Sequence, residues 1–385
     1  FVPDAASDKW KSVNELEGEP REAFQKLAKA FVDAIGANAE KPEATEELKN
    51  ASTAFVEAAR KQAPDNYADM KRIGWENHLN SFHPFKWAWI AYLIGVLFLT
   101  FHFYRPGGRL ALGAWVFLGL GFFLHAYGMA VRIYLSGRPP VTNMYETVVW
   151  VPWGSVLFSF ILARVQKNKV LLMCSATVAI FCLILTDLAP TVLDSSIHPL
   201  EPVLRSTFWL STHVLIITIS YAAFFLAFAI GDLMLFYYLK DENKYATQLR
   251  NGTHSIYRAI QIGVVLLAAG TILGGIWADY SWGRFWGWDP KETWAFIALM
   301  GYLALLHGRL AGLVKNFQLA AGAVIAFSLV IMAWYGVNFV LGAGLHSYGF
   351  GAGGVEYVTA FVVLHLLYVA YVSTVRYGRQ KSQSN

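Results

Sequence analysis

Nine long runs of mainly apolar residues, separated by short polar segments, constrain this chain more than any other feature. Most of the runs reach the roughly 20 residues that an α-helix needs to cross the hydrocarbon core of a bilayer. They cover Phe85–Phe103, Leu110–Val131, Thr147–Leu162, Val170–Leu188, Ser211–Leu239, Ile256–Trp277, Pro290–Leu310, Phe317–Val340 and Val355–Val375, of which Thr147–Leu162 is the shortest. Because lipid offers the backbone no hydrogen bonds, such runs fold as helices. The sequence therefore predicts an all-α, polytopic transmembrane bundle of about nine spans.

Composition and charge agree with a membrane protein. Hydrophobic residues make up 56% of the 385 residues and charged residues only 15%, whereas about a quarter of a typical soluble domain is charged. The net charge of +5 does not indicate nucleic-acid binding, because the basic residues lie beside the apolar runs. One alternating set of loops carries fourteen lysines and arginines and the other set only five. Cytoplasmic loops are the basic ones, so we expect a cytoplasmic C-terminus and an outer location for segment 278–292.

Residues 1–84 differ from the rest of the chain. Two segments around a turn-like stretch at 37–44 place apolar residues at helical spacing, which predicts a soluble helical hairpin. The predicted faces comprise Phe24, Leu27, Ala28, Phe31, Val32 and Ile35 in the first helix, and Leu48, Ala51, Phe55, Val56 and Ala59 in the second. The two cysteines of the chain, Cys174 and Cys182, form no CxxC or CxxCH motif. A thiol–disulfide role and a c-type cytochrome are therefore not indicated.

An aromatic segment between two apolar runs raises the question of function. "WGRFWGWDPKETW" (Trp282–Trp294) holds four tryptophans in thirteen residues. Tryptophan is enriched at membrane interfaces, so anchoring is one interpretation; the other is a platform for a large, flat ligand. Asp289, followed by Pro290 and with Glu292 three residues on, also predicts a helix start with a capping box.

Two histidines flank this aromatic segment on the predicted outer side. His213 opens the fifth apolar run, and His346 lies in the glycine-rich stretch "GAGLHSYGFGAGG". Two imidazoles beside an aromatic platform would suit a hexacoordinate heme, and Arg284 and Lys291 would suit its propionates. His307 lies near the inner end of its run, about 25 Å from Asp289 at helical rise, so it cannot share this outer site. For most of the ten histidines a structural role is the simpler interpretation.

These motifs together resemble one family of heme-handling membrane proteins. The segment ending in "GWDPKETW" is similar to the tryptophan-rich WWD signature of the CcsA/ResC family of system II cytochrome c biogenesis. "SGRPPVTNMYET", "THVLIITISYAAF" and "VNFVLGAGLHSYGF" resemble its outer loop and its two segments with external heme-ligating histidines. The resemblance covers about residues 110–375.

The resemblance implies a site and a cargo. By it, His213 and His346 are the external axial ligands of heme iron, and His307 is a transmembrane ligand. Heme b is both substrate and bound ligand, and no residue is assigned a catalytic role. Its platform and propionate contacts would come from Trp282, Arg284, Trp286, Trp288 and Asp289. The second inner ligand would come from a CcsB/ResB-type partner or fused portion, with His102 as a weaker alternative.

The resemblance also implies an activity and a location. The protein would export or hold heme at the outer face of the inner membrane and present it to the CxxCH thiols of apocytochrome c, acting as a cytochrome c synthetase if it is an enzyme at all. A thiol-reducing, thioredoxin-like protein is a further expected partner. Residues 1–84 would form an extracytoplasmic helical segment, 85–109 the first span and inner loop, and 110–385 the assembly domain. The chain would then be the C-terminal part of a CcsB–CcsA fusion.

Two other classes of protein fit part of the pattern. A diheme redox carrier of cytochrome b type also needs paired histidines, but it places them inside the bundle rather than beside an outer aromatic loop. A solute transporter without heme would use the tryptophans only as anchors. An absorption spectrum of the purified protein separates the transporter from the other two.

Overall fold

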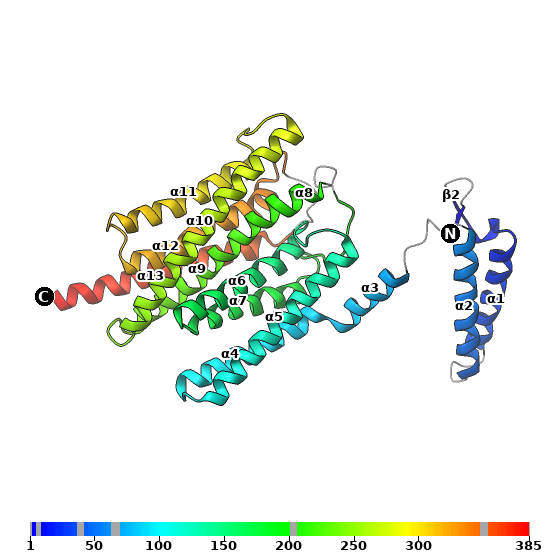
Figure 1. The fold of residues 1–385 in the computed structure, drawn as a ribbon, viewed down its shortest axis with the longest axis horizontal. Coiled ribbons are helices and arrows are strands. Elements are labelled where there is room, and N and C mark those ends of the chain that lie inside the picture. Colours follow the sequence, from blue (N-terminus) through cyan, green and yellow to red (C-terminus); the bar gives the residue numbers. More distant parts are fainter. Residues whose placement is uncertain are drawn as a thin grey trace. The chain divides into compact units, whose positions relative to one another are not determined.

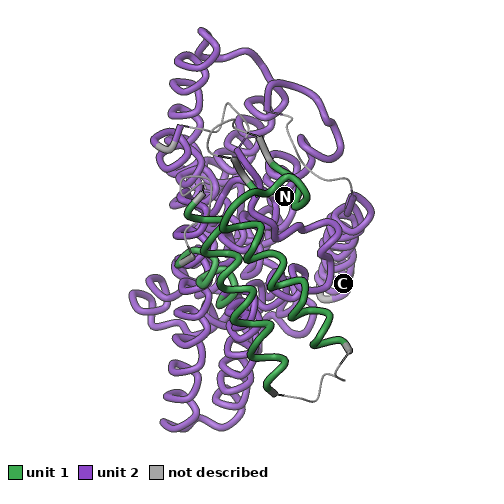
Figure 2. Tube along the Cα trace, turned by 90° about the vertical axis from the view of Figure 1, so that its right-hand side faces the viewer, with its two compact units in different colours: residues 1–78 green, residues 79–385 purple. Residues whose placement is uncertain are grey.

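The computed structural model describes residues 2–4, 9–36, 42–62, 70–200, 206–346 and 353–384, and this part of the chain is nearly all helical (Figure 1). The first five residues of the expected turn, 37–41, and the stretch 347–352 after His346 lie outside the described residues. The chain divides into two compact units, 1–78 and 79–385 (Figure 2).

The first unit contains the predicted helical hairpin. Its helices are α1 (Glu19–Gly36) and α2 (Pro42–Gln62), preceded by the strands β1 (Val2–Asp4) and β2 (Lys9–Lys11), which pair antiparallel, and the short helix η1 (Val13–Glu15). Phe24 and Phe55 meet edge to face at 5.6 Å between α1 and α2, so the hairpin is confirmed.

Near the end of the first helix the apolar face is not covered, because Phe31, Val32 and Ile35 are 54–66% exposed. The small β-ribbon was not predicted; its strands are only three residues long, too short to show an alternating pattern.

The second unit holds the membrane-spanning helices. Helix α3 (Met70–Phe82) lies mostly in the first unit and ends in the second. The second unit continues with α4 (Pro84–Tyr104), α5 (Gly108–Ser136), α6 (Met144–Gln166), α7 (Val170–Leu188), the short α8 (Thr207–Trp209), η4 (Leu210–Val214), α9 (Leu215–Lys240), α10 (Ala246–Trp282), α11 (Pro290–Leu310), α12 (Asn316–Ile331), η5 (Met332–Leu341) and α13 (Val355–Ser384). Within the described residues, nine helical segments are long and apolar enough to cross a membrane. The predicted multi-pass bundle is therefore confirmed.

Several helices extend beyond the predicted spans, and two of these differences change the loops. α10 begins at Ala246, ten residues before the predicted span, so part of the basic segment is helical. The aromatic loop is also shorter than 278–292, because α10 continues to Trp282 and α11 starts at Pro290. Gly283 ends α10 with a φ of +69°, a left-handed conformation that glycine adopts without strain.

Helix α9 forms the centre of the bundle. In the span that begins at Leu210, 67% of an 18-residue apolar stretch is buried inside the protein, against 11% of the corresponding stretch of α13. Phe224 of α9 stacks on Tyr302 of α11 at 3.8 Å between ring centroids. Gly263 of α10 lets the same ring approach closely, since a Cβ there would lie 2.5 Å from Phe224 Cε1. Close packing through small residues is how membrane helices gain contact where lipid is as apolar as the side chains.

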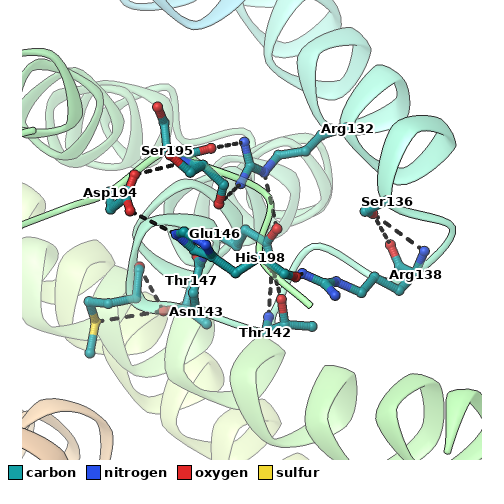
Figure 3. Close-up of polar contacts among 12 residues, drawn as sticks. Arg132, Ser136, Arg138, Thr142, Asn143, Glu146, Thr147, Asp194, Ser195 and His198 are labelled. Atoms are coloured by element: carbon teal, nitrogen blue, oxygen red, sulfur yellow. Dashed lines mark hydrogen bonds and ion pairs between the residues drawn. The ribbon is translucent and has the colours of Figure 1, made fainter. Parts of the chain in front are cut away.

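A buried ion pair ties two loops together at the end of the bundle where α5 ends and α6 begins (Figure 3). Arg132 Nε of α5 donates to Glu146 Oε1 of α6 at 3.1 Å, and the two side chains are only 5% and 0% exposed. Arg132 Nη1 also donates to the Ser195 carbonyl at 2.7 Å. The second oxygen of Glu146 accepts from the N–H and the hydroxyl of Thr142 at 2.8 and 2.6 Å. The pair is therefore bonded on both sides and holds segment 142–146 against the segment after α7.

Breaking this pair should cost much more stability than breaking an exposed pair beside it. We expect Glu146→Gln to lower the free energy of unfolding by roughly 3–5 kcal/mol, because it leaves the buried Arg132 charge without its carboxylate. Asp194→Asn is the matched control, because Asp194 pairs with His198 at 2.9 Å while both side chains are more than half exposed; exposed pairs contribute about 0–1 kcal/mol. Thermal unfolding in detergent measures both. Equal melting temperatures for the two variants would contradict the role of the buried pair.

Candidate functional site

A cavity of about 150 Å³ lies where the N-terminal ends of α6, α9 and α11, the C-terminal half of α10 and η5 meet. It brings together side chains that are far apart in the sequence. Among those that line it are His213, Trp286, Lys291, Glu292, Trp334 and His346. Four residues of the predicted outer site, His213, Trp286, Lys291 and His346, therefore share one cavity.

His213 is held by a hydrogen bond to the neighbouring helix. It lies in η4, a π-helical turn that leads into α9, and its Nδ1 is 2.8 Å from the Gly270 carbonyl of α10. Because a carbonyl only accepts, Nδ1 carries the proton and the neutral ring leaves the Nε2 lone pair available. The ring packs tightly on α10: a Cβ at Gly274 would lie 2.6 Å from His213 Cε1. Glycine at 274 is thus what lets His213 reach the wall of the cavity.

His346 is oriented in the same way by a carboxylate. Its Nδ1 is 2.8 Å from Asp289 Oδ2, so Nδ1–H donates, and the neutral ring in this tautomer has its lone pair on Nε2. The ring also meets Trp282 edge to face at 5.1 Å. A carboxylate behind an imidazole fixes the tautomer and raises the basicity of the far nitrogen, as in many metal sites.

Asp289 joins the start of α11 to the segment that carries His346. Its side chain accepts from the Lys291 N–H at 3.2 Å and, with Glu292, forms the predicted capping box, which is confirmed. It also accepts from the Leu345 N–H at 2.5 Å. Burial pushes the pKa of this carboxyl upward, but the hydrogen bonds from His346, Leu345 and Lys291 outweigh burial and leave the pKa below its ordinary value. Asp289 is therefore an anion at neutral pH.

Two other histidines of the described chain, His125 and His102, form hydrogen bonds through both ring nitrogens. His125 bonds the Val149 carbonyl at 2.9 Å through Nε2, with Nδ1 3.5 Å from Tyr92 Oη. His102 bonds the Gly107 carbonyl through Nδ1 and lies 3.1 Å from Lys169 Nζ through Nε2. Neither ring has a lone pair to offer without losing a bond, so the geometry does not favour His102 as a substitute inner ligand.

His307 lies apart from this cavity, as its position in the sequence predicted. It is exposed near the end of α11, and its Nδ1 is 2.8 Å from the Leu303 carbonyl. That bond places the proton on Nδ1 and leaves the Nε2 lone pair available, the same tautomer as in His213 and His346.

The residues of the aromatic loop differ in their positions. Trp286 lines the cavity. Trp288 does not; it is 67% exposed, has a φ of +56° and packs against Trp286 and Phe296. Arg284 lies outside the lining as well, with Nη1 3.1 Å from Glu292 Oε1 and its guanidinium 5.8 Å from the ring centre of Trp282. The predicted platform is therefore uneven, and Trp286 is its cavity-facing member.

Sequence reasoning missed the wall opposite the loop. Lys291 Nζ donates to the Trp334 carbonyl at 3.2 Å, and Trp334 Nε1 donates to Thr147 Oγ1 at 3.0 Å. These bonds connect α11, η5 and α6 around the cavity. Asn143 and Thr147 line the cavity and stand in the stretch "SGRPPVTNMYET", which the resemblance had marked only as an outer loop. Trp334 lies inside an apolar run, where nothing in its neighbours indicates a site.

The residues around the cavity have the chemistry to hold a heme, but the cavity is smaller than a typical ligand pocket. Two imidazoles that are hydrogen-bonded through Nδ1 and can offer Nε2 are suitable axial ligands, and Trp286 offers an aromatic face. Typical ligand pockets measure roughly 300–1,000 Å³, and this cavity of about 150 Å³ is smaller. A porphyrin would therefore extend beyond the closed part of the cavity through its open side.

Comparison with known proteins places the chain in a family. Residues 141–346 match the family described as cytochrome c assembly protein. The chain is 34% identical to the cytochrome c biogenesis protein CcsA of Prochlorococcus marinus (strain MIT 9515), over 58% of this chain and 80% of the relative. It is 30% identical to CcsA of Parasynechococcus marenigrum (strain WH8102), over 68% and 95%.

A third relative is much longer. The chain is 36% identical to protein NrfI of Wolinella succinogenes, over 60% of this chain but only 25% of that relative. The family match covers more than half of the 385 residues and includes both cavity histidines, His213 and His346. The chain therefore belongs to the cytochrome c assembly protein family.

Proposed function

We propose that this protein holds heme in the cavity between His213 and His346 and presents it for covalent attachment to apocytochrome c. As a member of the cytochrome c assembly family, the chain acts in cytochrome c biogenesis. One observation carries the assignment of the site: two imidazoles on one cavity, each fixed through Nδ1 and each with a free Nε2 lone pair. Heme b is the expected cargo, because its vinyl groups are what the attachment reaction consumes.

The reaction needs position more than acid–base catalysis. In thioether formation a cysteine S–H adds across a vinyl double bond: the sulfur bonds one carbon, a proton goes to the other, and nothing is oxidised. Orientation alone can lower the barrier of such a step by roughly 7–11 kcal/mol. Axial histidines would fix the plane of the heme, and Trp286 would support one face. This is the work of a cytochrome c synthetase, and we assign no residue a catalytic role.

Lys291 and Arg284 are suited to the propionates. Lys291 lines the cavity, and the only hydrogen-bond partner of its ammonium group among the described residues is the Trp334 carbonyl. Arg284 is held by Glu292, which lines the same cavity. A cationic pair at the edge of an aromatic site would bind carboxylates and fix which edge of the macrocycle faces out.

The charge bias of the loops supports an orientation. We place the protein in the inner membrane, with the C-terminus in the cytoplasm and the cavity with its aromatic loop on the periplasmic side. In this arrangement residues 110–385 are the assembly domain, 85–109 the first span with its inner loop, and 1–84 an outer helical segment. His307 would bind heme near the inner side before transfer. Its second ligand would come from a CcsB/ResB-type partner, and a thioredoxin-like protein would keep the cytochrome thiols reduced.

Removing either axial histidine should abolish holocytochrome formation. His213→Ala and His346→Ala each remove one Nε2 ligand, and added imidazole should restore activity in part because it can occupy the vacated axial position. The measurements are heme bound per protein and c-type cytochrome formed in a deficient host. His198→Ala is the control, because His198 lies in an exposed pair with Asp194 away from the cavity. Full heme content in both cavity variants would contradict the assignment.

Asp289→Asn tests the carboxylate behind His346. Asparagine still caps a helix well but loses the charge, so we expect heme affinity to fall about 10–100-fold while α11 stays folded. Asp289 has a lowered pKa, so its stabilising effect is present above its unfolded-state pKa of about 3.9 and disappears only as pH falls through the lower folded-state value. The affinity ratio between wild type and variant should therefore be constant from about pH 6 to about pH 8. A ratio near one would contradict the role.

The tryptophans should not be equivalent. Trp286→Ala should lower the heme-to-protein ratio more than Trp286→Phe, because phenylalanine keeps a flat apolar face; the difference should follow lost area at roughly 25 cal/mol per Å². Trp288→Ala is the matched comparison and should have less effect, since Trp288 is mostly exposed and outside the cavity lining. If the ratio is unchanged in every variant while membrane yield falls, the tryptophans are interfacial anchors.

A further inference from the structure

A second pair of titratable side chains lies inside the membrane, away from the heme cavity. Asp232 of α9 and His365 of α13 face each other, with Oδ2 and Nε2 3.1 Å apart. Neither residue lines the cavity described above. Asp232 is eight residues, or about 12 Å, from the end of its helix, and His365 is about 15 Å from the start of its own. Ionisable residues at such depth are costly and mark functional sites by default.

The hydrogen bonds determine how many protons the pair holds. His365 Nδ1 is 2.7 Å from the Phe361 carbonyl, which can only accept, so Nδ1 carries a proton. The contact between Nε2 and Oδ2 then requires one more proton between the two atoms. The pair is either an imidazolium with a carboxylate or an imidazole with a carboxylic acid, and both forms hold the same number of protons. Without that proton, a carboxylate would face the Nε2 lone pair at 3.1 Å.

The surroundings favour the neutral form. Asp232 Oδ1 is buried and has no hydrogen-bond partner among the described residues, so an ionised carboxylate would keep part of its charge unsatisfied in a medium of low polarity. The rings of Phe228 and Phe361 lie 4.9 and 4.2 Å from the His365 ring. They add apolar surface and no charge.

Besides His365, the Cys174 thiol of α7 and the Tyr368 hydroxyl of α13 lie in electrostatic range of the Asp232 carboxyl. Helix α12 also packs on α9, and its sequence "NFQLAAGAVIAFSLVI" holds no titratable side chain. Helices α6 and α10 pack on α9 as well, and their basic residues are Arg164 in α6 and Arg250, His254 and Arg258 in α10. Cys174 and Tyr368 are neutral in their ordinary states, so of the three groups in range only His365 can balance the charge of Asp232.

We propose that Asp232 and His365 form a reversible proton-binding site inside the membrane, whose loaded form is a carboxylic acid donating to an imidazole. Unloading breaks the acid O–H bond and passes the proton to water, leaving a carboxylate opposite a lone pair. That contact is repulsive, so proton release loosens α13 from α9. The site does not depend on the proposed heme function, because neither residue touches the cavity.

Infrared spectroscopy of the full chain in lipid bilayers tests the site directly. The carbonyl band of a protonated carboxyl should be present at neutral pH and absent from Asp232→Asn, in which the amide N–H still donates to His365 and the fold is kept. Raising the pH should remove the wild-type band reversibly, and His365→Leu should shift both the band and its midpoint because the acceptor is gone. Asp194→Asn is the control: a hydrogen bond from His198 and others from Ser196 lower the pKa of Asp194 to about 2, so it contributes no such band.

Two results would overturn the proposal. Identical carboxyl bands in wild type and Asp232→Asn at every pH would mean that Asp232 is ionised throughout. A band that belongs to Asp232 but persists unchanged into the alkaline range would make it a permanently protonated structural acid. Loss of the band in Asp232→Asn together with its reversible disappearance at high pH supports the site.

Discussion

The Asp289 carboxylate is the interaction on which the candidate site depends. It accepts a hydrogen bond from the backbone N–H of Lys291 at the start of α11, accepts another from the Leu345 N–H, and orients His346. A helix start is fixed within a bundle, so a side chain bonded to it inherits that fixed position. Gly344, with a φ of +96°, lies against the same carboxylate, where any Cβ would overlap Asp289 Oδ1. Asp289 therefore both caps α11 and fixes the segment that carries His346.

The two cavity histidines reach the same state by different means. His213 donates to a backbone carbonyl of α10 and His346 to a carboxylate. A carbonyl is neutral, whereas a carboxylate adds negative charge behind the ring and makes its far nitrogen the stronger donor to iron. If both histidines bind heme as proposed, two axial bonds of unequal strength would suit a protein that must both hold a cargo and release it. The bond to His213 would then be the first to break when heme leaves.

Much of this architecture could be predicted from sequence, and the limits have physical causes. The apolar runs predicted the membrane-spanning helices, because the lipid constrains the length and composition of each helix separately. The cap at Asp289 could be predicted because it depends on three neighbouring residues. By contrast, the roles of Trp286 and Trp288 could not be separated, since which indole enters the cavity depends on the backbone turn at 288 and on contacts with Phe296. Trp334 was missed because its partners, Thr147 and Lys291, come from other helices.

The walls of the cavity also share a departure from regular helix geometry. η4 carries His213, and η5, a π-helical segment of ten residues, carries Trp334 and Asn338. A π-helical turn inserts a residue and rotates the side chains on one side of it relative to the other, at a cost in hydrogen-bond geometry; such turns occur often at functional sites. If η4 continued α9 as a regular α-helix, the packing of α9 in the core would also fix the direction of each side chain in η4. The π turn frees His213 from that constraint, so α9 can pack at the centre of the bundle while His213, just before it, points into the cavity.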